Sequence, residues 1–204
     1  MIGNSVCHSA NIIIKVGSNS EITIDDRKFR GNIQLFRQPN MHLLVVNLIE
    51  LEDYVKGILY HEVSHYWPNE VLEAQAIVCR SYALYQKEQM VGKDYDLTSD
   101  VYSQVYGGKT SERYRINKAV DETKGIILKY NGKVLPAFFH AACGGHTEDG
   151  SVLWNVNMEP LKGVVCNYCP GSPHYNWHYV ISLKELEEKL SEGGYKISGI
   201  KNIE

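Results

Sequence analysis

Residues 51–85 read LEDYVKGILYHEVSHYWPNEVLEAQAIVCRSYALY, and the apolar pattern of this stretch is helical. Its first part has apolar residues at helical spacing, namely Leu51, Tyr54, Val55, Ile58 and Leu59. Trp67-Pro68 indicates the start of a second helix, because proline is well placed in a first helical turn. The stretch therefore predicts two helices joined by a short segment.

Strand-like runs precede this stretch, and elements of both kinds follow it. Turn residues separate four apolar runs before it, at residues 12–14, 22–24, 33–36 and 43–48. The elements expected after it are a helix over residues 111–123, a hairpin over 126–140 with an Asn-Gly turn, a strand over 177–181 and a helix capped by Ser182. The sequence therefore predicts an α+β protein of small antiparallel strands and three to four helices.

Length and composition favour one globular domain. We expect residues 1–204 to form one domain. Residues 1–50 would contain mainly strands, residues 51–177 the motifs, and residues 178–204 a strand and a helix at a truncated end. Lys and Arg are spread along a chain of net charge −3, which argues against nucleic acid as a partner. The sequence shows neither a transmembrane stretch nor a signal peptide. We therefore expect either a cytoplasmic protein or a piece of an exported one.

Three groups of residues combine side chains that could carry chemistry. The first is the segment 60–68, which contains Glu62 between two histidines. The second is the segment 102–108, and the third joins the loop 139–148 to the cysteines of segment 166–169.

Several segments, in order and at sensible spacing, resemble the stage II sporulation protein D family. The segments that carry the likeness are Leu51–Leu59, a glutamate at position 62, Trp67–Leu84, the Ser-Gln-Val-Tyr-Gly-Gly run Ser103–Gly108, the helix end Ala119–Gly125 and the Gly-Gly-x-Thr loop Cys143–Thr147. The resemblance extends from Leu51 to about Trp177.

The resemblance implies a lytic transglycosylase that cleaves peptidoglycan between N-acetylmuramic acid and N-acetylglucosamine and leaves 1,6-anhydro ends. In relatives it implies a non-catalytic enhancer of cell-wall amidases. By this likeness Glu62 is the acid/base catalyst. A glycosidic oxygen leaves poorly unless it is protonated, so partial burial near Tyr66 and Trp67 would help by raising the pKa of Glu62. One carboxyl suffices, because the sugar's own 6-hydroxyl replaces the nucleophile that hydrolysing glycosidases need.

The second and third groups of residues also suggest where substrate binds, and the resemblance suggests where the protein works. The expected substrate-binding residues, around a glycan-binding cleft, are Gln104, Tyr106, Gly144, Gly145, Thr147 and His140. The alternative for the segment Ser103–Gly108 is a plain strand-to-turn element. We expect glycan strands, including strands without stem peptides, and a cell-wall amidase as partners, and the cell envelope as location.

A competing interpretation uses the residues around Glu62. The run His61-Glu62-Val63-Ser64-His65 matches H-E-x-x-H, in which two histidines bind zinc and the glutamate activates water. Pro68 argues against a zinc peptidase, because the helix of such an enzyme normally continues past the second histidine. The metallopeptidase is therefore the less favoured alternative.

The cysteine-rich group predicts a separate, structural zinc site. Cys166 and Cys169 have the spacing of a zinc knuckle, and Cys143 with His146 supplies a second pair. Four such ligands fill the tetrahedral positions and leave none open for a reaction. His140 is an alternative ligand or a residue of the cleft, and the cysteines could instead be three buried free thiols. The lone cysteines are Cys7 and Cys79, and we expect Cys79 in the core.

Overall fold

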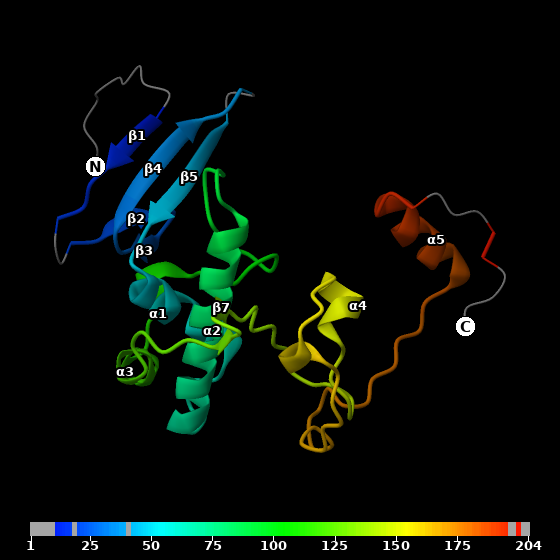
Figure 1. Ribbon diagram of the computed structural model, residues 1–204. Coiled ribbons are helices and arrows are strands. Elements are labelled where there is room, and N and C mark those ends of the chain that lie inside the picture. Colours follow the sequence, from blue (N-terminus) through cyan, green and yellow to red (C-terminus); the bar gives the residue numbers. More distant parts are fainter. Residues whose placement is uncertain (1–10, 18–19, 40–41, 196–198, 201–204) are drawn as a thin grey trace. The chain divides into compact units, whose positions relative to one another are not determined.

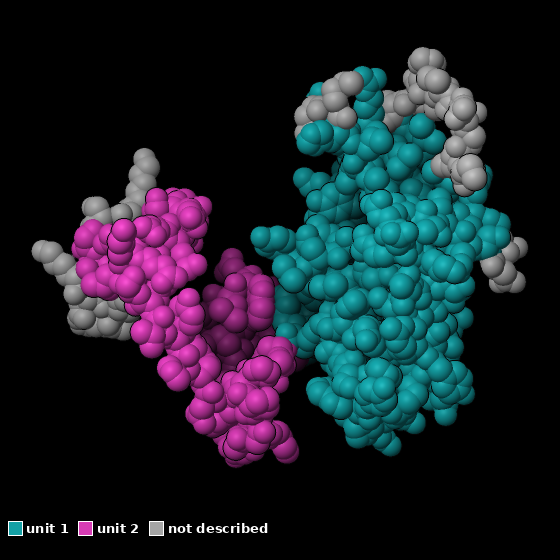
Figure 2. Space-filling view, turned by 180° about the vertical axis from the view of Figure 1, so that it is seen from behind, with its two compact units in different colours: residues 1–139 teal, residues 140–204 magenta. Residues whose placement is uncertain are grey.

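The computed structural model describes residues 11–17, 20–39, 42–195 and 199–200 and confirms the α+β class (Figure 1). The chain divides into two compact units, residues 1–139 and residues 140–204 (Figure 2). The single domain inferred from the sequence stays a prediction. Cys7 and the last four residues lie outside the described residues.

The first unit contains small antiparallel sheets. Strands β1 (Asn11–Ile14), β4 (Asn32–Arg37) and β5 (Leu43–Leu48) form one sheet in the order β1-β4-β5. Its register pairs Ile14 with Ile33, and Ile33 with Asn47. These strands and β2 (Ile22–Ile24) confirm the four runs predicted before residue 50.

Strand β2 forms a hairpin with a strand that the sequence does not predict, β3 (Arg27–Phe29). The sequence does not indicate β3 as a strand, because two of its three residues, Arg27 and Lys28, are charged. Asp25 and Asp26 join the two strands with positive φ angles of 46° and 61°. Two-residue hairpin loops favour such angles, and aspartate tolerates them.

Three helices form the core of the first unit. They are α1 (Leu51–Glu62), α2 (Asn69–Gln89) and α3 (Tyr114–Glu122), and the 3-10 helix η1 (Gly108–Ser111) precedes α3. Their shared core includes Val55, Ile58, Leu59, Leu72, Ala76, Cys79, Ile116, Ala119 and Val120. The two helices predicted within residues 51–85 are confirmed, and Cys79 lies in the core as expected.

A buried arginine ties these three helices together. Arg80 of α2 is completely buried, and its Nε and Nη2 donate to the carboxylate of Glu52 on α1 at 3.0 and 2.7 Å. The same guanidinium donates to the carbonyl oxygens of Ile126 at 3.0 Å and Val120 at 3.3 Å, near the end of α3. Its charge is therefore paired and its donors are satisfied, which is the condition for burying an arginine.

We expect Arg80→Met to lower the free energy of unfolding by about 3 kcal/mol, because it leaves the partly buried Glu52 without its partner. Urea denaturation measures this change. The matched control is Arg27→Met, since Arg27 is exposed and contacts the Phe29 ring at 5.6 Å. The control should lose less than about 1 kcal/mol. An equal decrease in the free energy of unfolding in both variants would show that the contacts of Arg80 do not stabilise the three helices more than an exposed arginine does.

The first unit ends in the predicted hairpin, which is shorter than expected. Strands β6 (Lys129–Tyr130) and β7 (Lys133–Val134) pair across a turn of Asn131 and Gly132, whose φ angles are 50° and 78°. The Asn-Gly signal therefore located the turn, but pairing covers only two residues on each side.

The second unit has little regular structure. Its elements are α4 (Gly150–Trp154), the 3-10 helix η2 (Glu159–Leu161) and α5 (Leu183–Glu192), so the described residues hold five α-helices rather than three to four. Ser182 caps α5 by accepting a hydrogen bond from the Glu185 N–H at 3.2 Å, as predicted. The strand expected at residues 177–181 is wrong, because this segment pairs with no described strand. Alternating apolar residues alone do not supply a hydrogen-bonded partner.

Candidate active site and cysteine cluster

An open surface pocket of about 580 Å³ lies at the junction of α1 and α2. Its lining residues are Tyr60, His61, Glu62, Val63, Ser64, His65, Tyr66 and Trp67. They form one continuous segment, so the local backbone decides which side chains meet there.

The pocket forms because α1 stops at Glu62. Val63 has extended backbone angles, φ −141° and ψ 150°, which end the helix, and its side chain is buried. Trp67 precedes Pro68, and a residue before proline avoids the helical conformation. Helix α2 therefore begins only at Asn69, and the segment 63–68 lines the pocket beside Glu62.

Arg115 of α3 holds this connecting segment in place. Its Nη1 donates to the His65 carbonyl oxygen at 2.9 Å, and its Nη2 donates to the Trp67 carbonyl at 2.9 Å and to Asn69 Oδ1 at 2.8 Å. The rings of His65 and Tyr66 lie 4.0 Å apart. Because Tyr66 is 80% exposed and Trp67 50% exposed, the segment presents a fixed aromatic surface to solvent.

Glu62 is a half-buried carboxyl, and within the described part of the chain it has no hydrogen-bond donor or cationic partner. Burial raises its pKa, because the charged form loses hydration. Burial also raises the pKa of Tyr82 on α2, and the charge of Glu62 adds to that effect. A carboxyl in this state keeps its proton at higher pH than an exposed one, as a general acid requires.

The two histidines beside Glu62 do not meet as metal ligands. His61 lies in the last turn of α1, and its Nε2 is 2.8 Å from Ser111 Oγ, whereas His65 lies beyond the helix end. Burial and the nearby charge of Arg113 lower the pKa of His61. Among the described residues, neither histidine belongs to a group with metal-binding spacing. A zinc peptidase needs both on one helix face, so the geometry argues against that alternative.

Gln104 and Tyr106, which the sequence suggests as substrate-binding residues, lie inside the core. Gln104 is completely buried, and its Oε1 accepts a hydrogen bond from the Tyr54 hydroxyl at 3.2 Å. Tyr106 packs on Tyr54 with ring centroids 5.3 Å apart, and its hydroxyl donates to Asn47 Oδ1 at 3.0 Å. A Cβ at Gly57 would overlap the Tyr106 ring. Both side chains therefore support α1 from within. The alternative of a strand-to-turn element is not found either, because the structure has no strand at residues 103–108.

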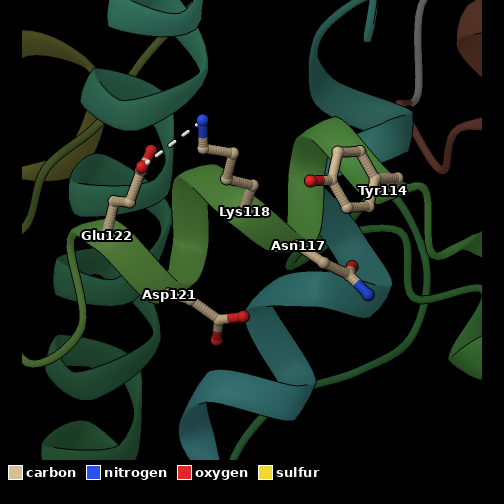
Figure 3. Close-up of a pocket in the computed structure, with 5 residues that line it drawn as sticks. All are labelled: Tyr114, Asn117, Lys118, Asp121 and Glu122. Carbon is tan, nitrogen blue, oxygen red and sulfur yellow. Dashed lines mark ion pairs between the residues drawn. The ribbon is translucent and has the colours of Figure 1, made fainter.

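A second open pocket, of about 480 Å³, lies along the exposed side of α3 (Figure 3). Its lining residues are Tyr114, Asn117, Lys118, Asp121 and Glu122. Lys118 pairs with Glu122 at 3.6 Å, and Asp121 pairs with Lys56 of α1 at 2.7 Å. These are the paired charges of a solvated helix face, and they provide no candidate catalyst.

Three cysteines of the second unit come together, as their spacing suggests. The sulfur atoms of Cys143, Cys166 and Cys169 all lie within 4.8 Å of one another. A backbone bridge pairs His146 with Val165, and the Cys166 N–H donates to the Gly145 carbonyl at 2.9 Å. A hydrogen bond from the backbone of Gly145 and contacts with the other thiols lower the pKa of Cys143, whereas the contact with Cys143 raises the pKa of Cys166. The thiolate form is therefore favoured at Cys143.

The other expected residues of this unit surround the cluster in different ways. His146 is not one of the grouped ligands, and its ring lies where a Cβ on Gly163 would clash. Gly144 and Gly145 have positive φ angles of 66° and 108°, which glycine adopts readily in a tight turn. Thr147 Oγ1 accepts a hydrogen bond from the Val164 N–H at 2.9 Å.

His140 is exposed at the start of the second unit. A ligand role for His146 or His140 stays a prediction. So do substrate contacts of Gly144, Gly145, Thr147 and His140.

Three residues near the pocket are not foreseen from the sequence: Ser111, Arg113 and Arg115. They belong to a segment that reads as an ordinary helix start. One signal could have drawn attention to them. Two arginines at a helix N-terminus interact unfavourably with the helix dipole, so this pattern indicates that the arginines have other contacts.

The described fold and site define an α+β protein with a candidate acid/base pocket at a helix junction. Residues 40–130 match the family described as Stage II sporulation protein, and this segment contains the whole pocket. The segment of residues 40–130 therefore belongs to the stage II sporulation protein D family, as the resemblance predicts.

Individual relatives cover more of the chain. An uncharacterized protein of Brachyspira hyodysenteriae is 37% identical over 170 residues, which are 83% of this chain and 46% of that protein. An amidase enhancer of Bacillus subtilis is 32% identical over 135 residues, 66% of this chain and 18% of that protein. Stage II sporulation protein D of Bacillus subtilis is 28% identical over 183 residues, 82% of this chain and 52% of that protein. The chain thus spans about half the length of these relatives or less.

Proposed function

We propose that this chain is a peptidoglycan lytic transglycosylase with Glu62 as its acid/base catalyst. The observation that supports this most directly is the state of Glu62, a half-buried carboxyl with a raised pKa in a surface pocket. Membership of residues 40–130 in the stage II sporulation protein D family supports a role in the cell wall during sporulation.

The proposed reaction needs one carboxyl and no water. Protonated Glu62 gives its proton to the oxygen between N-acetylmuramic acid and N-acetylglucosamine, and the bond from that oxygen to the muramic C1 breaks. The 6-hydroxyl of the same muramic residue attacks C1, and the Glu62 carboxylate takes its proton. The products are a 4-hydroxyl on N-acetylglucosamine and a 1,6-anhydro end, and Glu62 is protonated again.

The aromatic surface beside Glu62 supports a sugar substrate. Tyr66 and Trp67 are exposed, and Arg115 fixes the backbone that carries them. Flat apolar faces of this kind can cover the faces of sugar rings, and a fixed backbone reduces the entropy lost on binding. This surface is a better candidate for glycan contact than buried Gln104 and Tyr106.

A non-catalytic role is the second candidate, because one relative is named an amidase enhancer. In that case the pocket would bind glycan while a partner amidase does the chemistry. The two candidates separate when purified chain acts on glycan strands without any amidase. We expect soluble fragments from the chain alone. Unchanged strands, together with a faster amidase when both proteins are mixed, would replace our proposal by the enhancer.

We also propose that the second unit holds a structural zinc ion. Three thiols within 4.8 Å of one another fit a thiolate-rich tetrahedral site, and His146 is the predicted fourth ligand. Bound zinc would hold the segments around Cys143 and Cys166 together in a unit with few strands and short helices. The proposed cleavage of glycan has no step in which the zinc ion takes part.

The double variant His61→Ala/His65→Ala tests the zinc peptidase alternative. We expect it to keep zinc at the parent's stoichiometry, because the proposed ligands lie in the second unit. Some loss of glycan cleavage is expected, since both histidines line the pocket. Metal analysis by mass spectrometry reads the outcome. Zinc lost here but kept in Cys166→Ser would establish the peptidase pattern instead.

We propose the cell envelope as the place of action, because the proposed substrate is there. Within the described residues, no helix is both long enough and apolar enough to cross a membrane.

A further inference from the structure

Arg113 lies beside the pocket. Among the described residues, only its Nη1 donates hydrogen bonds, and its Nε and Nη2 donate none. Its carbon Cζ is 4.4 Å from the centre of the Tyr60 ring, and Tyr60 lines the pocket. Its Nη1 donates to the carbonyl oxygens of Thr110 at 3.0 Å and Glu112 at 2.8 Å. No described residue accepts a hydrogen bond from its Nε or Nη2.

The unused edge is the one that binds carboxylates elsewhere in this chain. Arg30 holds Glu112 through Nε at 2.6 Å and Nη2 at 2.9 Å. Arg80 holds Glu52 through the same two nitrogens. Among the described residues, no carboxylate forms an ion pair with Arg113. The Tyr60 ring and the two carbonyl oxygens nevertheless hold the guanidinium in one orientation.

The charge of Arg113 acts on the pocket without neutralising Glu62. Burial and, to a smaller extent, the charge of Arg113 lower the pKa of His61, whereas the pKa of Glu62 is raised by burial alone. A bound anion at Arg113 would lie near the Tyr60 ring. The site could contact one part of a substrate while Glu62 acts on another.

We propose that Arg113 is a specificity residue that binds a carboxylate of the glycan substrate through its Nε and Nη2. This rests on the proposed function. A planar guanidinium matches a carboxylate with two parallel hydrogen bonds, and partial exposure lets a ligand reach it. Peptidoglycan offers carboxylates from two sources, the lactyl group of muramic acid and the stem peptide. Both would satisfy the same edge.

The test compares Arg113→Gln with the parent by calorimetric titration, both in a Glu62→Gln background that prevents turnover. The ligands are muramic glycan oligomers with free lactyl carboxylates, the same oligomers with these groups amidated, and oligomers that carry stem peptides. We expect Arg113→Gln to weaken binding of the first about tenfold and of the amidated oligomers not at all. A similar loss with the third set would identify the peptide as a further source of the carboxylate.

Two control variants separate recognition from structure. Arg27→Gln removes an exposed arginine that also lies over an aromatic ring, but over Phe29, which is not a pocket residue, and it should change nothing. Arg113→Lys keeps a charge without the fork and should recover part of the affinity, with a stronger dependence on salt.

Equal weakening by Arg113→Gln for charged and amidated oligomers, or no change for either, would overturn the inference while leaving the proposed function intact. Absence of binding to every oligomer by the parent would overturn both.

Discussion

Glu62→Gln should reduce glycan cleavage by roughly 10²–10⁴-fold, the usual contribution of a general acid or base. Glutamine keeps the shape of the side chain but has no acidic proton for the glycosidic oxygen, so glycan binding should persist. The matched control is Glu70→Gln, because Glu70 is exposed in the first turn of α2 and does not line the pocket. Turnover at the parental rate in Glu62→Gln would remove this residue from the mechanism.

The pH dependence of cleavage follows from the same carboxyl. Glu62 must be protonated when the glycan binds, so kcat/KM should fall as pH rises through its pKa. Burial raises this pKa, so the fall should come at higher pH than for an exposed glutamate. Initial rates of glycan cleavage, measured at several pH values and low glycan concentration, give kcat/KM as a function of pH. A rate that instead rises with pH across this region would indicate a general base as the first actor.

Stability measurements on Glu62→Gln separate lost chemistry from lost fold. Because the folded-state pKa is raised, the stability linked to Glu62 is fully present below its unfolded pKa and is lost as pH rises through the folded pKa. Glutamine carries no charge to desolvate. The variant should therefore be at least as stable as the parent at pH 7, and any advantage should vanish near about pH 4.

Cys169→Ser should remove zinc from the second unit, from about one equivalent to near none, because the remaining thiols no longer close the site. Loss of the metal should leave residues 140–204 accessible to protease, since this unit contains only short helices and one isolated backbone bridge among its described residues. Metal analysis and limited proteolysis measure the two effects.

A cysteine outside the cluster provides the control for this experiment. Cys79→Ala alters a fully buried thiol in the core of the first unit, so it should lower thermal stability while zinc stays bound. Protein that never contained zinc, purified without chelator, would refute the metal proposal. Zinc kept by Cys169→Ser would show that this cysteine is not a ligand.

Local patterns in the sequence were sufficient for most elements of the first unit. The helical spacing of Leu51 to Leu59 and the proline at 68 locate α1 and α2, because one buried face and one helix start are short-range properties. Asn131-Gly132 locates a turn for the same reason. The strand expected at residues 177–181 fails, since a strand also depends on a partner that its own residues do not encode.

In the candidate site, too, local sequence predicts some features, whereas others depend on residues far away in the chain. Position 62 follows from the family pattern, and the meeting of Cys143, Cys166 and Cys169 follows from their spacing. Burial of Gln104 and Tyr106 could not be read from their segment, because it depends on Tyr54 and on contact with Gly57 of α1. Polar and aromatic residues of one loop suit a sugar site and a buried core equally well, because the sequence does not show which residues pack against them.

The most direct test of the account is mass spectrometry of the products that purified chain releases from glycan strands. A lytic transglycosylase uses the 6-hydroxyl of muramic acid, so its fragments end in 1,6-anhydro muramic acid and are lighter by one water molecule than hydrolysis products. We predict these anhydro ends with the parent chain and their absence with Glu62→Gln. Fragments with reducing ends would show hydrolysis, which requires an activated water and a carboxylate to activate it, and would contradict the mechanism proposed for Glu62.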